Sequence, residues 1–345
     1  MASLITLSDI RGAQRRIAGV AVRTGLHRVE PERLRAAGVA ELPFALWIKA
    51  ESEQPIGSFK LRGAYNRIAQ LSAEELGRGV ITYSSGNHAQ GVAYAARALG
   101  SKAVIVMPDN APAVKIDATK ALGAEVVFVG PASSARRAKA EELAAKYGYT
   151  VIPPYDDPAI IAGQATCGLE IVEQLGIAAN AGGRVVILSP VSGGGLLSGI
   201  ATAVKLAAPG ARVQVWGAEP ELAADAKESF DTKTLVEWTA AQTTRTICDG
   251  LRTQSVGVLN FEHILRYVDG IVTVSEDKIV PAMRVMLAAT GLVAEPSGAV
   301  TLAAALFHHG ELPKCEKMVA VLSGGNIEPE MRQQLGADAA GIAST

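Results

Sequence analysis

VITYSSGNHAQGVAYAARALGSKAVIVM, residues 80–107, carries a strand–helix–strand unit in the spacing of its apolar residues. The runs at 80–83 and 103–107 are short and almost wholly apolar, as strands covered on both faces are. Between them, residues 89–99 are rich in alanine, a strong helix former, and Gly100 follows as a helix-ending glycine. This pattern predicts two parallel strands joined by a helix.

The same alternation continues on both sides of this unit and predicts the class of the fold. Further strands are expected at residues 45–49, 125–129, 149–152, 184–188, 213–217, 271–274 and 317–322. Further helices are expected at residues 8–20, with Ser8 as the N-cap, and at 61–71, 113–122, 133–146, 158–175, 196–207, 276–289 and 297–307. Residues 232–258 and 337–345 lack the pattern and are expected to be a mobile surface segment and a loose tail. We therefore expect an α/β protein with two open, twisted, mainly parallel sheets and helices on both faces.

The regular part of the pattern also indicates how the chain divides into domains. Residues 80–153 are compact enough to form a small domain of their own. Residues 1–56 and 154–345 are then expected to form a large domain, and residues 57–79 to connect the two.

Composition and charge argue against two classes of function. The chain has 345 residues, of which 49% are apolar and 19% are charged, and its formal net charge is −1. Because no basic stripe is present, binding to nucleic acid has little support. No apolar run reaches the length of a membrane span, and the first residues lack the apolar core of a signal peptide. We expect a protein that binds neither nucleic acid nor membrane.

The three cysteines, Cys167, Cys248 and Cys315, are scattered through the chain. Their odd number and wide spacing argue against a disulfide framework and against a zinc site. Such a set fits the reducing environment of the cytoplasm.

One lysine, Lys60, lies between an aromatic residue and a helix-forming run in the stretch Pro55–Ala64. A lysine held in an apolar pocket loses its proton near neutral pH, because burial disfavours the charged form. The neutral amine can then form a Schiff base with an aldehyde. The commoner role of a single lysine is to keep its charge in water above a buried stem, so Lys60 alone does not decide the function.

Three turns that follow predicted strands contain groups able to bind a ligand. Ser192-Gly193-Gly194-Gly195 precedes a helix, where bare backbone N–H groups form an anion site and glycines let a phosphate approach. Ser84-Ser85-Gly86-Asn87-His88 could hold a carboxylate through its N–H groups and hydroxyls. Ser323-Gly324-Gly325-Asn326 lies at the end of a strand, where open α/β sheets bind ligands. Each turn also has an ordinary interpretation as a tight or helix-capping turn.

A fourth segment, Glu219-Pro220-Glu221-Leu222-Ala223-Ala224-Asp225, offers carboxylates after a strand. Oxygen ligands at this spacing suit Mg²⁺ or Ca²⁺. A solvated acidic segment is the commoner explanation of such a run, so the segment by itself gives only weak support to a metal site.

Taken together, these motifs resemble those of the fold-type II pyridoxal-phosphate enzymes, and within them the serine/threonine dehydratase and serine racemase family. The resemblance extends over nearly the whole chain, from Arg23 to Asn326. Matching segments are Gly57–Ala64 (cofactor lysine), Ser84–His88 (substrate carboxylate), Val191–Leu196 (phosphate), Ser323–Asn326 (ring nitrogen), Pro154–Pro158 and Glu295–Gly298. The resemblance implies a tryptophan synthase β-like fold, pyridoxal 5′-phosphate bound by the large domain, an amino acid as the substrate and a homodimer.

The resemblance also implies a role for each matching residue. Lys60 would hold the cofactor as a Schiff base and remove the Cα proton, and Ser85 would be the acid or base on the opposite face in a racemase. The other cofactor-binding residues would be Phe59 beside the ring, Asn87 at its 3′-hydroxyl, Ser323 at its nitrogen, and Ser192, Gly193, Gly194, Gly195 and Leu196 around the phosphate. The substrate carboxylate would be bound by Ser84, Ser85, Gly86, Asn87 and His88. A divalent cation, Mg²⁺ or another, would be held by Glu219, the carbonyl of Ala223, and Asp225.

Two positions depart from the family pattern and leave the subfamily open. Gly25 stands where the family usually has proline, and Ser192 takes the first place of a loop that often has four glycines. Neither change removes a group that the chemistry requires.

The resemblance leaves three functions open. The first is a dehydratase, or ammonia-lyase, that converts an L-β-hydroxy amino acid to a 2-oxo acid and ammonia by α,β-elimination of water. L-Threonine and L-serine are its default substrates, with 3-hydroxyaspartate and phenylserine as others. The second is a serine racemase that uses Lys60 and Ser85. The third is a non-catalytic, cofactor-binding regulatory protein, against which the intact Lys60, Ser85 and Ser323 argue.

Overall fold

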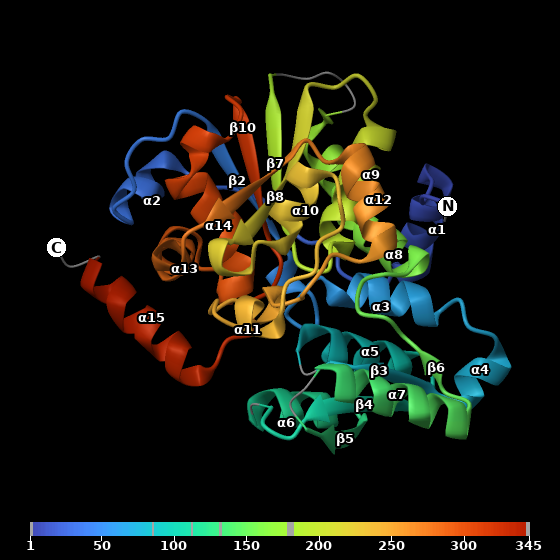
Figure 1. The fold of residues 1–345 in the computed structure, drawn as a ribbon. Helices are drawn as coiled ribbons and strands as arrows, with labels where there is room; N and C mark the ends of the chain where they lie inside the picture. Colours follow the sequence, from blue (N-terminus) through green and yellow to red (C-terminus); the bar gives the residue numbers. More distant parts are fainter. Residues whose placement is uncertain (1–2, 85, 112, 131–132, 178–182, 343–345) are drawn as a thin grey trace.

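The computed structural model describes residues 3–84, 86–111, 113–130, 133–177 and 183–342, which form two stacked α/β units (Figure 1). The upper unit in this view contains a six-stranded sheet and the lower unit a four-stranded sheet. The expected fold class, two mainly parallel sheets surrounded by helices, is confirmed. The division into domains at residues 80 and 153 stays a prediction.

The large sheet has the strand order β1-β2-β10-β7-β8-β9. Its strands are β1 (Leu26–Arg28), β2 (Ala45–Ala50), β7 (Val185–Pro190), β8 (Val213–Pro220), β9 (Gly270–Val274) and β10 (Lys317–Leu322). Neighbouring strands are parallel except β1 and β2, which are antiparallel. The carboxyl ends of β2, β10, β7, β8 and β9 therefore meet at one edge, where loops can form a binding site.

The small sheet has the order β5-β4-β3-β6, and all of its pairs are parallel. Its strands are β3 (Val80–Tyr83), β4 (Ala103–Pro108), β5 (Glu125–Val129) and β6 (Thr150–Val151). From β6 the chain crosses back to the large unit through residues 152–157.

Helices cover both faces of the large sheet. The helices of the chain are α1 (Leu7–Ile17), α2 (Pro31–Ala36), α3 (Lys60–Ile68), α4 (Ala73–Arg78), α5 (Asn87–Ala98), α6 (Ala113–Ala121), α7 (Ser133–Tyr147), α8 (Pro158–Leu175), α9 (Gly195–Ala207), α10 (Asp225–Thr232), α11 (Ala240–Thr243), α12 (Val258–Tyr267), α13 (Glu276–Thr290), α14 (Pro296–Phe307) and α15 (Pro329–Ile342). On β7, Val186 and Leu188 pack into a core with α13 and α14, whereas Val185 and Ile187 pack into a core with α8 and α9. Burial on both sides explains why the strands are continuously apolar in sequence.

The N-cap predicted for the first helix is wrong. Helix α1 begins at Leu7, and its N-cap is Thr6 rather than Ser8. The Thr6 hydroxyl accepts a hydrogen bond from the N–H of Asp9 at 3.3 Å, and the Asp9 carboxylate accepts one from the N–H of Thr6 at 2.8 Å. This reciprocal capping box satisfies two N–H groups at once, which Ser8, already inside the helix, could not do.

Two other expectations about irregular segments are corrected by the structure. Residues 337–342 continue helix α15 and are not a loose tail, whereas residues 343–345 lie outside the described part. Residues 232–258 contain α11 and a 3₁₀ turn, η4 (Asp249–Leu251), and they bury Cys248 and Leu251 in the core. Residues 232–258 are mostly polar, so the few buried apolar residues among them did not stand out in the sequence.

Helix α3 lies very close to helix α8, because glycine faces the contact on both sides. A β-carbon at Gly63 would come within 2.4 Å of Gln164 Nε2, and one at Gly163 would lie 2.6 Å from the carbonyl oxygen of Arg62. Real β-carbons do not approach so closely, so a larger residue at either position would push α3 away. The position of α3 matters because Lys60 is its first residue.

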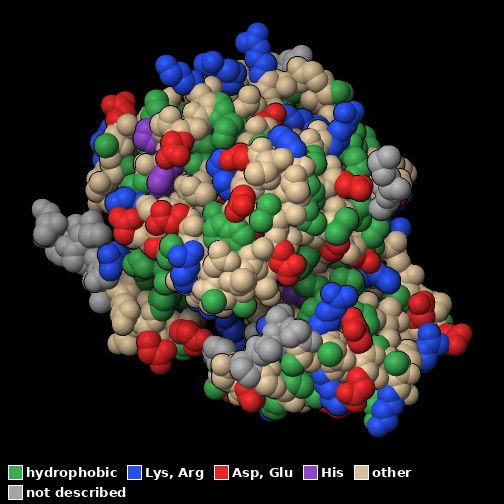
Figure 2. Space-filling view, in the orientation of Figure 1, with side chains coloured by type: hydrophobic (Ala, Val, Ile, Leu, Met, Phe, Trp, Pro, Cys, Tyr) green, Lys and Arg blue, Asp and Glu red, His purple; other side chains and the backbone are tan. Residues whose placement is uncertain are grey.

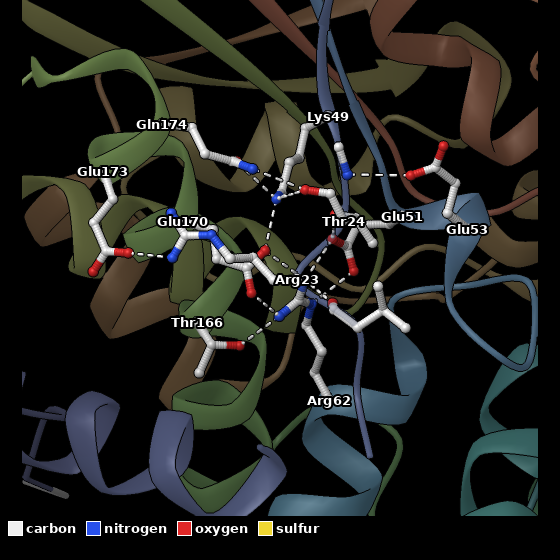
Figure 3. A network of polar contacts seen from close by, with 12 residues as sticks. Arg23, Thr24, Lys49, Glu51, Glu53, Arg62, Thr166, Glu170, Glu173 and Gln174 are labelled. Atoms are coloured by element: carbon white, nitrogen blue, oxygen red, sulfur yellow. Dashed lines mark hydrogen bonds and ion pairs between the residues drawn. The ribbon is translucent and has the colours of Figure 1, made fainter. Parts of the chain in front are cut away.

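A buried network of charges around Arg62 holds α3 in place (Figure 3). Arg62 donates two hydrogen bonds to Glu51, at 2.7 and 2.8 Å, and two to Glu170, at 2.7 and 2.9 Å. It donates another to Thr166 Oγ1 at 3.1 Å. Two residues apart on a helix means a rotation of about 200°, so Lys60 and Arg62 leave α3 in opposite directions.

Lys49 makes this network electrically neutral. Its ammonium group donates to three acceptors: Glu170 Oε2 at 2.6 Å, the carbonyl of Thr24 at 2.9 Å and Gln174 Oε1 at 3.0 Å. Although burial acts to raise it, the charges of Arg62 and Lys49 lower the pKa of Glu51 to about 2, so the carboxylate stays ionised. Two cations thus face two carboxylates with their hydrogen bonds satisfied, which is what allows four charges to lie in the interior.

Two further observations concern the surface and the lengths of the helices. On the face drawn in Figure 2, acidic and basic side chains are intermixed over both units. Within the described ranges, no helix is both long and apolar enough to cross a membrane.

The Arg62 network predicts that removing a buried ion pair lowers the free energy of unfolding far more than removing an exposed one. Arg62→Leu is expected to lower the free energy of unfolding by about 3–5 kcal/mol, because it leaves Glu51 and Glu170 buried with one cation fewer. The control, Arg35→Leu, removes an exposed ion pair with Glu32 and should cost less than about 1 kcal/mol. Urea unfolding of both variants measures the difference, and equal losses would contradict the anchoring role of the network.

Candidate active site

Two segments far apart in sequence come together at the start of α3. Ser58 forms an antiparallel bridge with Gly324, the N–H of Phe59 donates to the carbonyl of Ser323 at 3.0 Å, and the N–H of Gly325 donates to the carbonyl of Gly57 at 2.9 Å. These are backbone contacts, and added β-carbons at Gly57, Gly324 and Gly325 would lie 2.3, 2.4 and 2.5 Å from neighbouring atoms. The lysine stretch and the loop after β10, which were predicted separately, are therefore one site.

Glycine is required at Gly57 for two reasons. Its φ is +70°, a backbone conformation that side chains disfavour, and a β-carbon there would lie 2.3 Å from Asn326 Oδ1. Asn326 in turn donates to the carbonyl of Ile56 at 2.9 Å. The turn before Lys60 is thus closed by a side chain from the opposite end of the chain.

The Lys60 amine is half-buried and has the properties expected of a reactive lysine. It donates to the carbonyl of Pro154 at 2.8 Å and lies 5.1 Å from the centre of the Phe59 ring. Burial lowers the pKa of Lys60 to about 8. A sizeable fraction of the amine is then neutral, and able to act as a nucleophile or a base, near neutral pH.

The glycine loop lies between β7 and α9, as predicted. Helix α9 starts at Gly195, and Gly194 before it has a φ of +93°. Leu196 is buried, while the Ser192 hydroxyl contacts Thr253 Oγ1 at 2.9 Å. The loop therefore offers the backbone N–H groups at the start of a 13-residue helix, a favourable place for a phosphate.

The segment Ser84–His88 lies at the carboxyl end of β3, at the start of α5. Ser84 Oγ accepts from the N–H of Gly86 at 3.3 Å, whereas Ser85 lies outside the described residues. His88 Nε2 lies 3.1 Å from the carbonyl oxygen of Ile152, which can only accept, so Nε2 carries the proton. Burial and the nearby charge of Lys60 lower the pKa of His88 to about 3, so this ring is neutral at physiological pH.

Asn87 connects the small unit to the loop after β10 and to Glu295. Its Oδ1 accepts from Asn326 Nδ2 at 2.8 Å, and its Nδ2 donates to Glu295 Oε1 at 2.7 Å. A residue of the small unit is thus held by two residues of the large unit, beside the turn that precedes Lys60. The contact brings Asn87 next to the turn that precedes Lys60, and its role toward a cofactor stays a prediction.

Glu295 is a residue of the site that we did not predict as a ligand or catalytic group. It is only 5% exposed, and its burial together with the charge of Asp249 raises its pKa to about 8. Asp249 itself pairs with Lys115 of the small unit. The sequence signal was a glutamate directly before the proline that starts a mostly apolar helix, which places a carboxyl group at a buried helix start.

Two of the three candidate metal ligands, Glu219 and Asp225, are carboxylates that lie close enough to repel each other. Glu219 and Asp225 are both 1% exposed, and burial and mutual repulsion raise the pKa of Glu219 well above its usual range. Glu219 accepts from the N–H groups of Ala226 and Lys227, at 3.2 and 2.9 Å, and Asp225 Oδ2 is buried without a hydrogen-bond partner. In the described residues, no group of three or more His, Cys, Asp or Glu side chains is placed to hold a metal.

The chain is similar in sequence and structure to several known proteins. A family model described as pyridoxal-phosphate dependent enzyme matches residues 27–324. L-threo-3-Hydroxyaspartate ammonia-lyase of Saccharomyces cerevisiae is 39% identical over 82% of this chain and 83% of its own length. Serine racemase of Schizosaccharomyces pombe is 36% identical over 95% of this chain and 96% of its own length. A crystal structure of threonine deaminase from T.th. matches with a TM-score of 0.85 at 42% identity, over 94% of this chain and 99% of that chain.

The raised pKa of Glu295 predicts how stability depends on pH. Below pH 4.5 the carboxyl group is protonated in both states, but between 4.5 and about 8 only the unfolded chain loses the proton, so the wild type loses stability over this range. Glu295→Gln keeps an oxygen for Asn87 and does not titrate, so its stability relative to wild type should rise from pH 4.5 to 8 and then level off.

Urea unfolding over this pH range measures the effect. Glu316→Gln is the matched control: hydrogen bonds from the Arg184 backbone and side chain lower the pKa of Glu316, so this carboxylate is ionised in both states above pH 4.5 and its substitution should show no pH dependence over this range. A Glu295→Gln variant that loses stability as pH rises would contradict the assignment.

Proposed function

Because the chain belongs to the pyridoxal-phosphate-dependent enzymes, we propose that it is an ammonia-lyase that dehydrates L-β-hydroxy amino acids of the threonine and serine type. Water is eliminated across Cα and Cβ, and the products are a 2-oxo acid and ammonia. The observation that carries this proposal is the Lys60 amine, with a pKa of about 8, at the junction of the loop after β10 and the start of α5.

The residues around Lys60 fit pyridoxal 5′-phosphate. The three glycines before and at the start of α9 carry no side chains of their own, which lets a phosphate approach the N–H groups of the helix start. In the proposed arrangement Lys60 holds the aldehyde carbon, and the remaining contacts come from Phe59, Asn87, Ser192, Gly193, Gly194, Gly195, Leu196 and Ser323. When bound, this cofactor supplies an electron sink for negative charge at Cα.

The side chains of the chain itself supply the proton transfers and the orientation. Lys60 would be the base for the Cα proton, since its lowered pKa leaves a neutral fraction at physiological pH. The N–H groups and hydroxyls of Ser84–His88 hold the substrate carboxylate at the start of α5. His88 contributes as a neutral ring fixed by Ile152, not as a cation.

The lyase, the racemase and the regulatory protein differ in the support that they receive from relatives. Relatives named for hydroxyaspartate and threonine support the lyase, and they leave the substituent at Cβ open between methyl, hydrogen and carboxylate. A relative named serine racemase supports racemisation as the second candidate, which would need Ser85 as the acid or base opposite Lys60. A purely regulatory role has no relative among these proteins in its favour.

The buried carboxylates Glu219 and Asp225 support a divalent cation as part of the proposal. Burial raises the pKa of Asp225 to about 7, and its Oδ2 has no hydrogen-bond partner. Ionising two buried carboxyl groups this close is unfavourable when no positive charge lies beside them. A hard cation such as Mg²⁺ or Ca²⁺, bound also by the carbonyl of Ala223, would relieve the repulsion.

We also propose that the enzyme is cytoplasmic and a homodimer. The three cysteines are free and buried, which suits a reducing compartment. The dimer rests on the family resemblance alone.

Substitution of Lys60 tests the central assignment. Lys60→Ala should lose both the visible absorbance of bound cofactor and all release of 2-oxo acid from L-threonine, L-serine, L-threo-3-hydroxyaspartate and phenylserine. Ser85→Ala should abolish D-serine formation, measured by chiral chromatography, while 2-oxo acid release stays above that of Lys60→Ala. A wild-type protein that is silent with the whole panel, or turnover that survives Lys60→Ala, would refute the proposal.

The proposed cation site predicts that Asp225→Asn is more stable than the wild type without a cation but is not stabilised by added cation. Without added cation, Asp225→Asn should raise the melting temperature, because it relieves the repulsion with Glu219. With Mg²⁺ or Ca²⁺, the wild type should melt higher and the variant should not respond. Glu221→Gln, at the exposed glutamate of the same segment, is the control that should respond as the wild type does. A wild type that is indifferent to both cations and to chelator contradicts the site.

A further inference from the structure

Residues 154–157, which lead from the small unit into α8, contact several parts of the candidate site. The carbonyl of Pro154 accepts the hydrogen bond from Lys60. At the other end, Asp157 caps α8 by accepting from the N–H groups of Ala159 and Ile160, at 2.7 and 3.0 Å. Asp157 also pairs with Arg67 of α3 at 3.1 Å. This crossing segment is therefore tied to the helix that carries the lysine.

The second residue of the crossing segment, Tyr155, lies directly against the glycine loop. A β-carbon at Gly193 would be 2.4 Å from Cγ and Cδ1 of the Tyr155 ring and 2.6 Å from Cδ2. The ring thus occupies the space that any side chain at Gly193 would need. At Gly195 the nearest atom to an added β-carbon is again from Tyr155, at 3.3 Å.

The third residue, Asp156, is linked to Gly193 indirectly, through the start of helix α12. Its carboxylate caps helix α12, accepting from the N–H groups of Val258, Leu259 and Asn260 at 3.1, 3.0 and 3.3 Å. The start of this helix holds the Gly193 carbonyl through the N–H of Gly257, at 3.0 Å, and through Asn260 Nδ2, at 2.8 Å. Gly193 is therefore fixed between the ring of Tyr155 and a helix that Asp156 caps.

We propose that Tyr155 is a positioning residue that sets the distance between the Lys60 amine and the glycine loop. Tyr155 packs on Gly193 through its ring, while the adjoining Pro154 carbonyl holds Lys60. One cofactor must meet both groups at once, so an error of about 1 Å in their separation is enough to lose much of the activity. This inference rests on the proposed roles of Lys60 and the loop.

The contacts indicate that Tyr155 acts by packing and not by proton transfer. Burial, with the neighbouring Tyr83, Asp156 and Asp225, raises the pKa of its phenol to about 12, so the hydroxyl stays neutral in the working range. The ring carbons, and not the hydroxyl, are the atoms nearest to Gly193. Tyr155→Phe should therefore keep the function that Tyr155→Ala loses.

The test uses the full chain freed of cofactor. Two quantities are measured: the Kd for pyridoxal 5′-phosphate from its absorbance, and the pH midpoint of Lys60 acetylation by acetic anhydride, followed by mass spectrometry. The second needs no cofactor. The variants are Tyr155→Phe, Tyr155→Ala, Gly193→Ala and the double variant Tyr155→Ala/Gly193→Ala. Tyr147→Ala removes an exposed tyrosine of α7 as the control.

Tyr155→Ala and Gly193→Ala are each expected to weaken cofactor binding by about tenfold or more, through misplacement of the loop. Tyr155→Ala should also move the Lys60 midpoint upward from about 8, because loss of the ring frees the adjoining Pro154 carbonyl, which holds the amine in its buried place. Tyr155→Phe and Tyr147→Ala should match the wild type. The double variant should lose less than the two single losses combined, because the added methyl group fits the space that the ring leaves.

The proposal would be overturned if the losses of cofactor affinity in Tyr155→Ala and Gly193→Ala simply added in the double variant. A Tyr155→Ala variant with the wild-type Kd and the wild-type Lys60 midpoint would overturn it as well. If Tyr155→Ala does not fold, Gly193→Ala decides: an unchanged Kd and midpoint would show that the ring does not constrain the loop. Failure of the proposed function looks different, because the wild type would then bind the cofactor no better than Lys60→Ala does.

Discussion

The site depends on a neutral set of buried charges that holds helix α3 by its rear face. Arg62 bridges two carboxylates on one side of the helix, and Lys60 leaves on the other. Because Arg62 has a rigid, planar fork, its paired hydrogen bonds fix both the rotation of α3 and its position along its axis. The lysine can then lie in a desolvated place without being the residue that anchors the helix.

Glycine at close contacts is the second constraint on the site. Gly63 and Gly163 let α3 rest on α8, Gly57 lets Asn326 close the turn before Lys60, and Gly193 lets the Tyr155 ring reach the loop. In each case, backbone meets a neighbouring segment where a β-carbon has no space. The candidate site is therefore assembled from backbone contacts, and its chemistry is carried by the few side chains that project from them.

Sequence motifs singled out the groups whose pattern is local. The loop around Gly194 and the turn before Asn87 each stand between a strand and a helix start, and together with the stretch around Lys60 they carry the resemblance that implies their roles. Glu295 and Tyr155 were not predicted as site residues, because their partners lie far away in the chain. A motif shows which residue types are present locally, but it does not show which residues from distant parts of the chain will contact them.

The sequence by itself determined the α/β class, the parallel sheets and the order of the strand-to-helix turns. It did so because burial on both faces leaves a continuous apolar run, and because turns need glycine and capping residues that can be recognised locally. Only the tertiary structure decided the protonation of Lys60, His88 and Glu295, whose pKa values lie near 8, 3 and 8. These values come from desolvation and nearby charges, which depend on segments from opposite ends of the chain.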